Sequence, residues 1–183
     1  MTEYMKENPD ASEPAIIRDF HNELSGMFIR KYKDLFDIPS EEFTYAIIQI
    51  SRGHRKVDLY DEKEYPILHT EKGIIRTPFL GALIRLADEI DVGAERNLEL
   101  LFDTSTLTEQ KDIDAFGINE SIRRVEVKEK EIILYTKPKE ERFIELLIQC
   151  ADKIQQTLDY CRDVSEKRSD LTITQQKVLI KPV

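Results

Sequence analysis

The sequence predicts an α+β protein in which an N-terminal helical region precedes a small β-β-α-β unit. Apolar residues recur at helical spacing in three segments of the first hundred residues. After Asn97 the pattern changes to short strand-like runs around one long helical segment. We therefore divide the chain into a polar tail at 1–11, a helical region at 12–100 and an α+β unit at 101–183, with the boundary near residues 97–105.

The first predicted helix begins at Ser12, whose hydroxyl suits an N-cap, and Pro14 falls in its first turn. Its apolar positions follow helical spacing at Ile16, Ile17, Phe20, Leu24, Met27, Phe28 and Tyr32. A second helix is predicted to begin at Pro39-Ser40-Glu41-Glu42 and to end at Gly53, which places His54 at its C-terminal exit.

Residues 55–76 show no sustained period, so we expect an ordered but irregular connection of the kind that is often functional. Thr77 and Pro78 open a third helix with a broad apolar face that ends near Gly93. Asp88 and Asp91 then lie one turn apart on this helix.

In the second half, Val125 and Val127 predict one strand and residues 132–135 predict another, joined by the polar turn at 128–130. Pro138 precedes a long amphipathic helix with apolar residues at Phe143, Leu147, Cys150, Ile154, Leu158 and Cys161. A closing strand at 172–180 completes the β-β-α-β unit, whose helix can cover one face of a three-stranded sheet.

Composition narrows the class of function. A net charge of −9 disfavours broad binding to nucleic acid, because such binding needs many Lys and Arg contacts to phosphates. No apolar stretch reaches the roughly 20 residues of a membrane span, and the first twenty residues are too charged for a signal peptide. Cys150 and Cys161 lie about 16 Å apart on one helix, too far to bridge each other. We expect a cytoplasmic protein with reduced cysteines and no membrane partner.

Two histidines and one aspartate are the candidate metal ligands. His21 lies on the first predicted helix, His54 follows the second, and Asp88 lies on the third. If these helices pack antiparallel, one end of the bundle gathers imidazole and carboxylate groups, which suit a first-row divalent metal and a metal-bound water. Each residue also has an ordinary structural interpretation: an exposed helix position for His21, a charge near a helix C-terminus for His54 and an ion pair with Arg85 for Asp88.

The third helix carries the most specific pattern in the chain. The run Ala82-Leu83-Ile84-Arg85-Leu86-Ala87-Asp88-Glu89-Ile90-Asp91 resembles the last motif of the HD superfamily of metal-dependent phosphohydrolases. It is similar to the branch with an Arg-Leu-Ala-Asp-Glu-x-Asp helix, which is often fused to chaperone-type ATPase domains. Residues 17–23 and 50–56 match two upstream segments of that branch in the right order, and Arg76 and Glu95-Arg96 also fit.

The resemblance covers about residues 14–97 and implies roles for particular residues. It implies an N-terminal helical bundle of HD-domain type. Asp88 would be the terminal metal-ligand aspartate, with His21 and His54 as accessory ligands or phosphate-facing groups. The ion would be divalent (Mn, Mg, Fe or Zn), with Asp91 and Arg96 placed behind its ligands. The candidate substrate-binding residues are Arg85 and the basic cluster around His54, and this cluster suits either a phosphate contact or a solvated helix end: Arg52, Arg55 and Lys56. Asp91 would order either Arg85 or Arg96.

One part of the superfamily pattern is missing from the sequence. No His-Asp dipeptide occurs anywhere, and Asn22 follows His21 where the family needs a carboxylate. An amide neither balances metal charge nor takes a proton, so we expect either a piece of a longer protein or a domain that has lost its complete metal site. Phosphate loops of the Gly-x-x-x-x-Gly-Lys type, Gly-x-Ser-x-Gly elbows and Cys-x-x-Cys pairs are also absent.

Three functions remain open. The first is a partial or degenerate phosphohydrolase domain that binds a nucleotide or another small phosphate-containing ligand, or that regulates a partner domain. The second is an active metal-dependent phosphohydrolase of small phosphate esters in the intact protein, so the enzyme assignment stays uncertain. A third alternative is a module for protein interaction or homo-oligomer formation, since the β-β-α-β unit offers free sheet edges. The sequence favours the first class.

Overall fold

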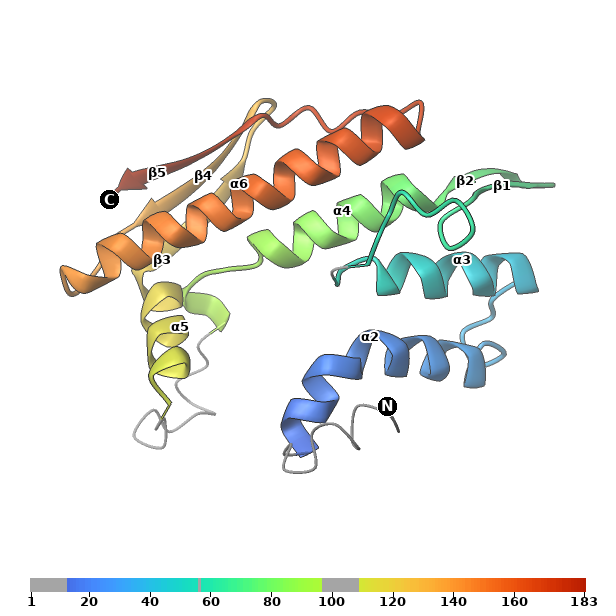
Figure 1. The fold of residues 1–183 in the computed structure, drawn as a ribbon, viewed down its shortest axis with the longest axis horizontal. Coiled ribbons are helices and arrows are strands. Elements are labelled where there is room, and N and C mark those ends of the chain that lie inside the picture. Colours follow the sequence, from blue (N-terminus) through green and yellow to red (C-terminus); the bar gives the residue numbers. More distant parts are fainter. Residues whose placement is uncertain (1–12, 56, 97–108) are drawn as a thin grey trace. The chain divides into compact units, whose positions relative to one another are not determined.

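The computed structural model describes residues 13–55, 57–96 and 109–183 and has the α+β class predicted from the sequence (Figure 1). It divides into two compact units, 1–85 and 86–183, which are described separately. The division falls within helix α4 (Thr77–Ile90). The whole boundary predicted near 97–105 and the whole predicted tail lie outside the described residues. None of the described helices is long and apolar enough to cross a membrane.

In the first unit, helix α2 (Glu13–Lys31) packs against helix α3 (Glu41–Arg52). The ends of α3 are those that the sequence predicts. The Ser40 hydroxyl accepts a hydrogen bond from the Phe43 amide at 3.3 Å, and the Gly53 amide closes the helix by donating to the Gln49 and Ile50 carbonyls at 3.0 Å. Because both caps are local, α3 has well-defined ends, and His54 follows directly.

The connection after α3 is more regular than the sequence suggests. Its last ten residues form an antiparallel hairpin of β1 (Ile67–Thr70) and β2 (Gly73–Arg76), so the prediction of an irregular stretch through residue 76 is wrong for this part. Gly73, with φ +133°, occupies the turn in a conformation that side chains rarely adopt. Four-residue strands are too short to show a period, and their cross-strand pairing depends on the turn.

A close backbone approach joins α3 to the first part of α4. A Cβ atom added to Gly53 would lie 2.7 Å from the Gly81 Cα atom, a separation that real side chains do not adopt. Around this contact Leu59 and Tyr65, from the preceding connection, are almost completely buried with Ala82. The two glycines therefore let the helices approach closely enough to enclose a small core.

The second unit consists of α5 (Gln110–Ser121), β3 (Ile122–Val127), β4 (Glu131–Thr136), α6 (Arg142–Arg168) and β5 (Lys177–Pro182), with the last five residues of α4 and a short 3-10 turn η1 (Ala94–Arg96). The sheet order is β3-β4-β5. Strand β4 pairs antiparallel with β3 and parallel with β5, so α6 is the crossover connection. The sequence did not reveal α5, whose apolar periodicity is weak.

The core of the second unit lies between the sheet and α6. Leu134 of the central strand packs with Ala151 and Ile154 of α6, and Val125 and Val178 of the edge strands border this cluster. Of the five, Leu134 and Ile154 are fully buried. One long amphipathic helix therefore covers the apolar face of the sheet, as the spacing of its apolar residues predicts.

Candidate functional site

Packing of α2 against α3 brings two of the three candidate metal ligands together. The Nε2 atoms of His21 and His54 lie 2.6 Å apart, and their ring centroids lie 4.7 Å apart with the planes tilted by 47°. These residues are 33 positions apart in the sequence. Both side chains are half-buried. Of the three groups expected to converge, the two imidazoles therefore meet within the first unit.

Hydrogen bonding assigns the protonated nitrogen of His54. Its Nδ1 atom lies 2.5 Å from the Ser51 carbonyl oxygen. A carbonyl oxygen can only accept, so Nδ1 carries the hydrogen and donates it. In the neutral ring the Nε2 atom then presents a lone pair toward His21, and His21 donates in the contact between the two rings. Metal-ligating histidines are oriented in the same way, by a carbonyl that accepts from the second ring nitrogen.

The imidazole pair fits part of a metal site. Two nitrogen ligands of a tetrahedral ion stand about 3.4 Å apart at a metal–nitrogen distance of about 2.1 Å, so the rings would have to separate by several tenths of an ångström. Across the described residues, no group of three or more His, Cys, Asp or Glu side chains is placed to hold a metal ion. The pair supplies two ligands, and further ligands would have to come from water, from a bound phosphate or from residues elsewhere.

The third candidate ligand, Asp88, is an exposed residue of α4. It belongs to the second unit, whereas both histidines belong to the first. Its role as a metal ligand therefore rests on the sequence resemblance and stays a prediction.

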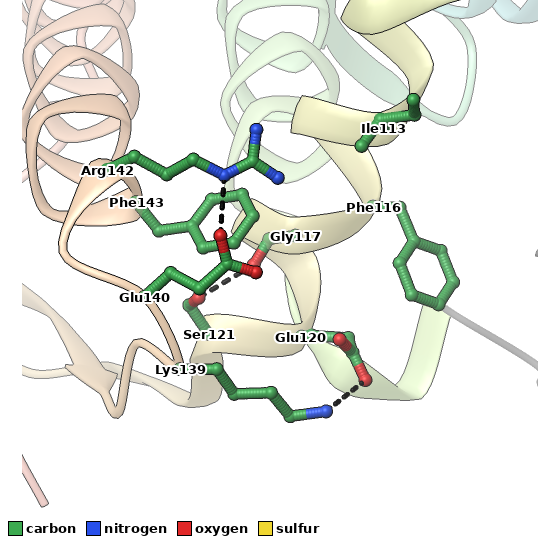
Figure 2. A pocket seen from close by; sticks show the side chains of 9 residues that line it. All are labelled: Ile113, Phe116, Gly117, Glu120, Ser121, Lys139, Glu140, Arg142 and Phe143. Atoms are coloured by element: carbon green, nitrogen blue, oxygen red, sulfur yellow. Dashed lines mark hydrogen bonds and ion pairs between the residues drawn. The ribbon is translucent and has the colours of Figure 1, made fainter. Parts of the chain in front are cut away.

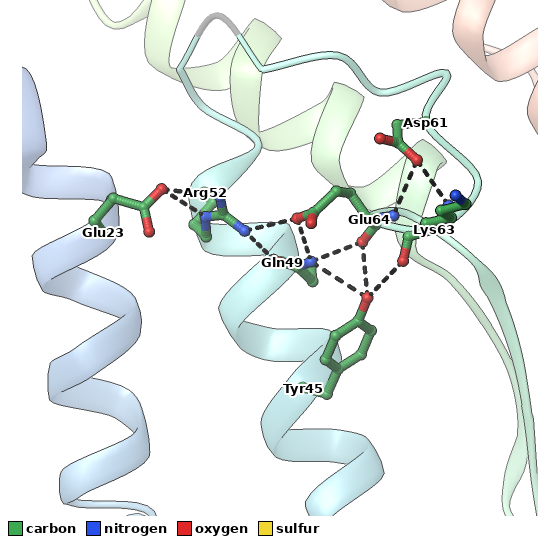
Figure 3. Close-up of polar contacts among 7 residues, drawn as sticks. All are labelled: Glu23, Tyr45, Gln49, Arg52, Asp61, Lys63 and Glu64. Atoms are coloured by element: carbon green, nitrogen blue, oxygen red, sulfur yellow. Dashed lines mark hydrogen bonds and ion pairs between the residues drawn. The ribbon is translucent and has the colours of Figure 1, made fainter.

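Arg52 joins α2, α3 and the following loop through a polar network (Figure 3). Its guanidinium group lies 2.8 Å from Glu23 on α2 and 2.9 Å from Glu64 in the loop, and it also donates to the Gln49 amide oxygen at 2.7 Å. Gln49 and Arg52 donate to the Glu64 carboxylate and hold its pKa below the usual range. The guanidinium group thus has three protein acceptors, and a role for Arg52 toward a substrate remains a prediction.

Gln49 and Tyr45 complete this network and were not singled out from the sequence. The Gln49 amide nitrogen donates to the Glu64 carbonyl oxygen at 2.8 Å, and the Tyr45 hydroxyl lies 3.0 Å from the Lys63 carbonyl oxygen (Figure 3). Gln49 is almost fully buried. A buried glutamine on an otherwise apolar helical face is a visible sequence signal, but the loop that it binds is distant in the chain.

Arg85 ties α4 to the segment that follows α3. Its Nε atom donates to the Gly53 carbonyl oxygen at 2.8 Å, and a terminal nitrogen donates to the Val57 carbonyl oxygen at 2.7 Å. These two carbonyls flank the segment that contains His54. Arg85 therefore helps to hold the backbone around His54, whereas its predicted contact with a substrate remains untested.

The structure describes the other site residues predicted from the sequence only in part. Arg55 is half-buried in the turn after α3. Lys56 lies outside the described residues, as does the side chain of Arg96 in η1. Asp91 is exposed just after α4, where it lines a pocket of about 250 Å³ together with Arg123 and other residues of the second unit.

A larger pocket in the second unit, of about 310 Å³, lies between α5 and the start of α6 (Figure 2). Its charged groups are paired with one another: Lys139 with Glu120 at 3.0 Å, and Arg142 with Glu140 at 2.8 Å. These cations already have carboxylate partners. The pocket therefore has less positive charge available to bind an anionic ligand than its residue types suggest.

Comparison with known proteins gives one match. The family model described as HD-CE matches residues 3–167. No curated protein and no solved structure matches the chain significantly. The matched span includes His21, His54 and Asp88 and covers well over half of the sequence, so the chain belongs to the HD-CE family and contains an HD-type domain.

Proposed function

We propose that this HD-type domain holds a divalent metal ion at His21 and His54 and uses it to bind a phosphate-containing ligand, such as a nucleotide, as a regulatory module. The observation that carries the proposal is the contact between the two imidazole rings, in which the Ser51 carbonyl orients His54 so that its Nε2 lone pair faces His21. HD-type domains typically bind divalent metals.

We propose binding rather than turnover because the chain offers an incomplete ligand set. A bound divalent ion would polarise a phosphate oxygen and lower the pKa of its water. The residues at hand supply two neutral nitrogen ligands, with Asp88 as the third ligand implied by the sequence resemblance. Asn22, beside His21, is a buried amide that cannot replace the missing carboxylate as a proton acceptor.

The phosphate ligand would be held by the metal and by the basic residues next to His54. Arg55 and Lys56 follow His54 directly. The backbone of the half-buried Arg55 is hydrogen-bonded in the turn, whereas its guanidinium group has no ion-pair or hydrogen-bond partner among the described residues. Arg52 and Arg85 already contact carboxylates and carbonyls of the protein, so we assign them to positioning the segment around His54. A planar guanidinium can donate two parallel hydrogen bonds to phosphate oxygens, which favours Arg55 as the anion contact.

Metal binding is tested by titrating Mn²⁺ and Zn²⁺ into the intact protein by calorimetry. We expect His21→Ala and His54→Ala each to weaken metal binding by more than about tenfold, because each removes one ligand. His69→Ala is the matched control, since His69 is an exposed histidine on β1 outside the pair. Asp88→Ala weakens binding if the resemblance identifies the third ligand. Unchanged affinity in both pair variants would overturn the metal proposal.

Ligand binding is tested separately by thermal shift, with inorganic phosphate, a nucleoside monophosphate and the matching nucleoside as probes. We expect only the phosphate-bearing probes to raise the melting temperature of the protein. This stabilisation should require Mn²⁺ and should be lost in Arg55→Ala. Equal stabilisation by the nucleoside would show that the phosphate is not recognised. Release of phosphate from the nucleotide by the intact protein, abolished by His54→Ala, would replace the binding proposal with the alternative of an active phosphohydrolase.

A further inference from the structure

The pocket of about 250 Å³ in the second unit carries charges of both signs. We call it the β3 pocket. It is lined by residues 90–95, which run from the end of α4 into η1, and by residues 123–125 of β3. The turn η1 packs against both α5 and β3, so the whole lining belongs to one compact unit. Clefts for drug-sized ligands measure roughly 300–1,000 Å³, so the β3 pocket suits a smaller molecule.

A β-bulge places two arginines next to each other at this pocket. The pairing of β3 with β4 shifts by one residue between Ile122 and Arg124, which makes Arg123 an extra residue in the strand. Consecutive side chains of a regular strand point to opposite faces of the sheet. Here Ile122 is buried, whereas Arg123 and Arg124 are both exposed and line the same pocket. The bulge therefore gathers two guanidinium groups at one site.

The charged groups of the β3 pocket differ in the partners that they already have. The Cζ atom of Arg124 lies 4.3 Å from the centroid of the Tyr135 ring, and a terminal nitrogen of Arg124 lies 3.6 Å from the Glu126 carboxylate. The guanidinium group of Arg123 has no ion-pair or hydrogen-bond partner among the described residues, and the same holds there for the carboxylate of the exposed Glu95. One cation and one anion are therefore available to a ligand.

We propose that the β3 pocket binds a small zwitterion, an α-amino acid with an aliphatic side chain. Arg123 holds its carboxylate and Glu95 holds its ammonium group. The lining contains two guanidinium groups and two carboxylates, those of Asp91 and Glu95. A simple anion is attracted by the arginines and repelled by the acids, whereas a ligand with both charges complements both signs. The planar guanidinium of Arg123 also matches the two oxygens of a carboxylate.

The apolar part of the lining favours an aliphatic side chain on this ligand. Ile90, Val92 and Val125 are partly buried against the core of the second unit and also line the pocket. A branched aliphatic group placed on them removes apolar surface from water on both sides of the contact. The residues that line the pocket include no aromatic ring on which a nucleobase could stack. Size, charge and apolar surface therefore favour the same class of ligand.

The ligand class is tested by calorimetry on the full protein with L-leucine as the probe. Two analogues each lack one charge: 4-methylpentanoate has no ammonium group, and 3-methylbutylamine has no carboxylate. We expect saturable binding of leucine and at least tenfold weaker binding of both analogues, because each leaves one charged group of the pocket without its hydrogen-bond partner. Binding of 4-methylpentanoate as tight as that of leucine would reveal a simple anion site and overturn the proposal. Failure of leucine to bind at millimolar concentration would do the same.

Substitutions test which residues hold the two charges. Arg123→Gln and Glu95→Gln should each weaken leucine binding at least tenfold and leave the melting temperature of the ligand-free protein unchanged, since both side chains are exposed. Glu129→Gln is the matched control, because Glu129 is an exposed carboxylate of the β3–β4 turn outside the pocket. Unchanged affinity in both pocket variants contradicts the assignment.

A further variant separates this proposal from the metal site of the first unit. His54→Ala should bind leucine as tightly as wild type, because His54 belongs to the first unit and the β3 pocket to the second. Loss of leucine binding in His54→Ala, with retention in Arg123→Gln, would assign the amino acid to the histidine pair and refute the β3 pocket. Failure of the metal titration alone leaves the leucine experiment unaffected.

Discussion

Each of the two units of this protein is stabilised internally by a different kind of interaction. In the second unit, β4 and α6 enclose an apolar core in which Leu134, Ile154 and Leu158 are fully buried. In the first unit, polar groups link the elements: Gln49 and Arg52 bind the loop at Glu64, and Arg85 binds the carbonyls around His54. Hydrophobic burial tolerates small displacements, whereas hydrogen bonds fix direction. The elements of the unit with the histidine pair are therefore positioned mainly by directional hydrogen bonds.

The largest effect that this comparison predicts is in the apolar core of the second unit. Leu134→Ala removes buried volume against Ala151 and Ile154, so we expect a loss of about 3 kcal/mol in the free energy of unfolding. Urea denaturation gives the value, and hydrogen exchange shows whether residues 86–183 lose protection first. Val127→Ala, on the same sheet but 54% exposed, should cost far less. Similar losses in the two variants would contradict an apolar core centred on Leu134.

An intermediate effect is expected where the backbones of α3 and α4 meet in the first unit. Gly53→Ala places a Cβ atom 2.7 Å from the Gly81 Cα atom, and the backbone cannot yield as a side chain can. We expect a loss of about 2 kcal/mol and weaker hydrogen-exchange protection in α3. Gly81→Ala is the matched control, because its new atom would meet side chains rather than backbone: the end of Leu59 at 3.0 Å and the ring of Tyr65 at 3.4 Å. A Gly53 variant as stable as wild type would show that the helices can separate freely.

The smallest effect concerns the polar network and depends on pH. The pKa of Glu64 is lowered because Gln49 and Arg52 donate to its carboxylate, so the native state binds this proton less tightly than the unfolded state. The stabilisation is present above the ordinary value of 4.5 and is lost as the pH falls through the lower folded value. Since the side chain is half exposed, we expect less than about 1 kcal/mol.

Glu64→Gln should remove this part of the acid sensitivity. The measurement is the free energy of unfolding at neutral pH and at pH values below the ordinary carboxyl pKa, compared with wild type. Glu71→Gln is a control at a carboxylate of the β1–β2 hairpin for which the structure gives no ion-pair partner in the part that it describes. If wild type and Glu64→Gln lose stability in parallel as the pH falls, the network does not couple folding to this proton.

Local sequence signals predicted the ends of α3 and the positions of α2, α4, α6 and β4 well. Ser40 and Gly53 act on neighbouring backbone groups, and amphipathic spacing records which side of a helix is buried, so both are visible without tertiary structure. The hairpin of β1 and β2 and the helix α5 were missed, because their segments are short or weakly periodic. Their existence depends on partners that the local sequence does not specify.

The sequence by itself determined the α+β class, the order of the main elements and the motif around Asp88. Tertiary structure alone decided that His21 and His54 meet at 2.6 Å and that Arg52 and Arg85 bind protein acceptors. The physical reason is the sequence separation over which each kind of interaction acts. Propensities and caps act over one or two helical turns, whereas these contacts join positions roughly thirty residues apart and form only when α2, α3 and α4 pack.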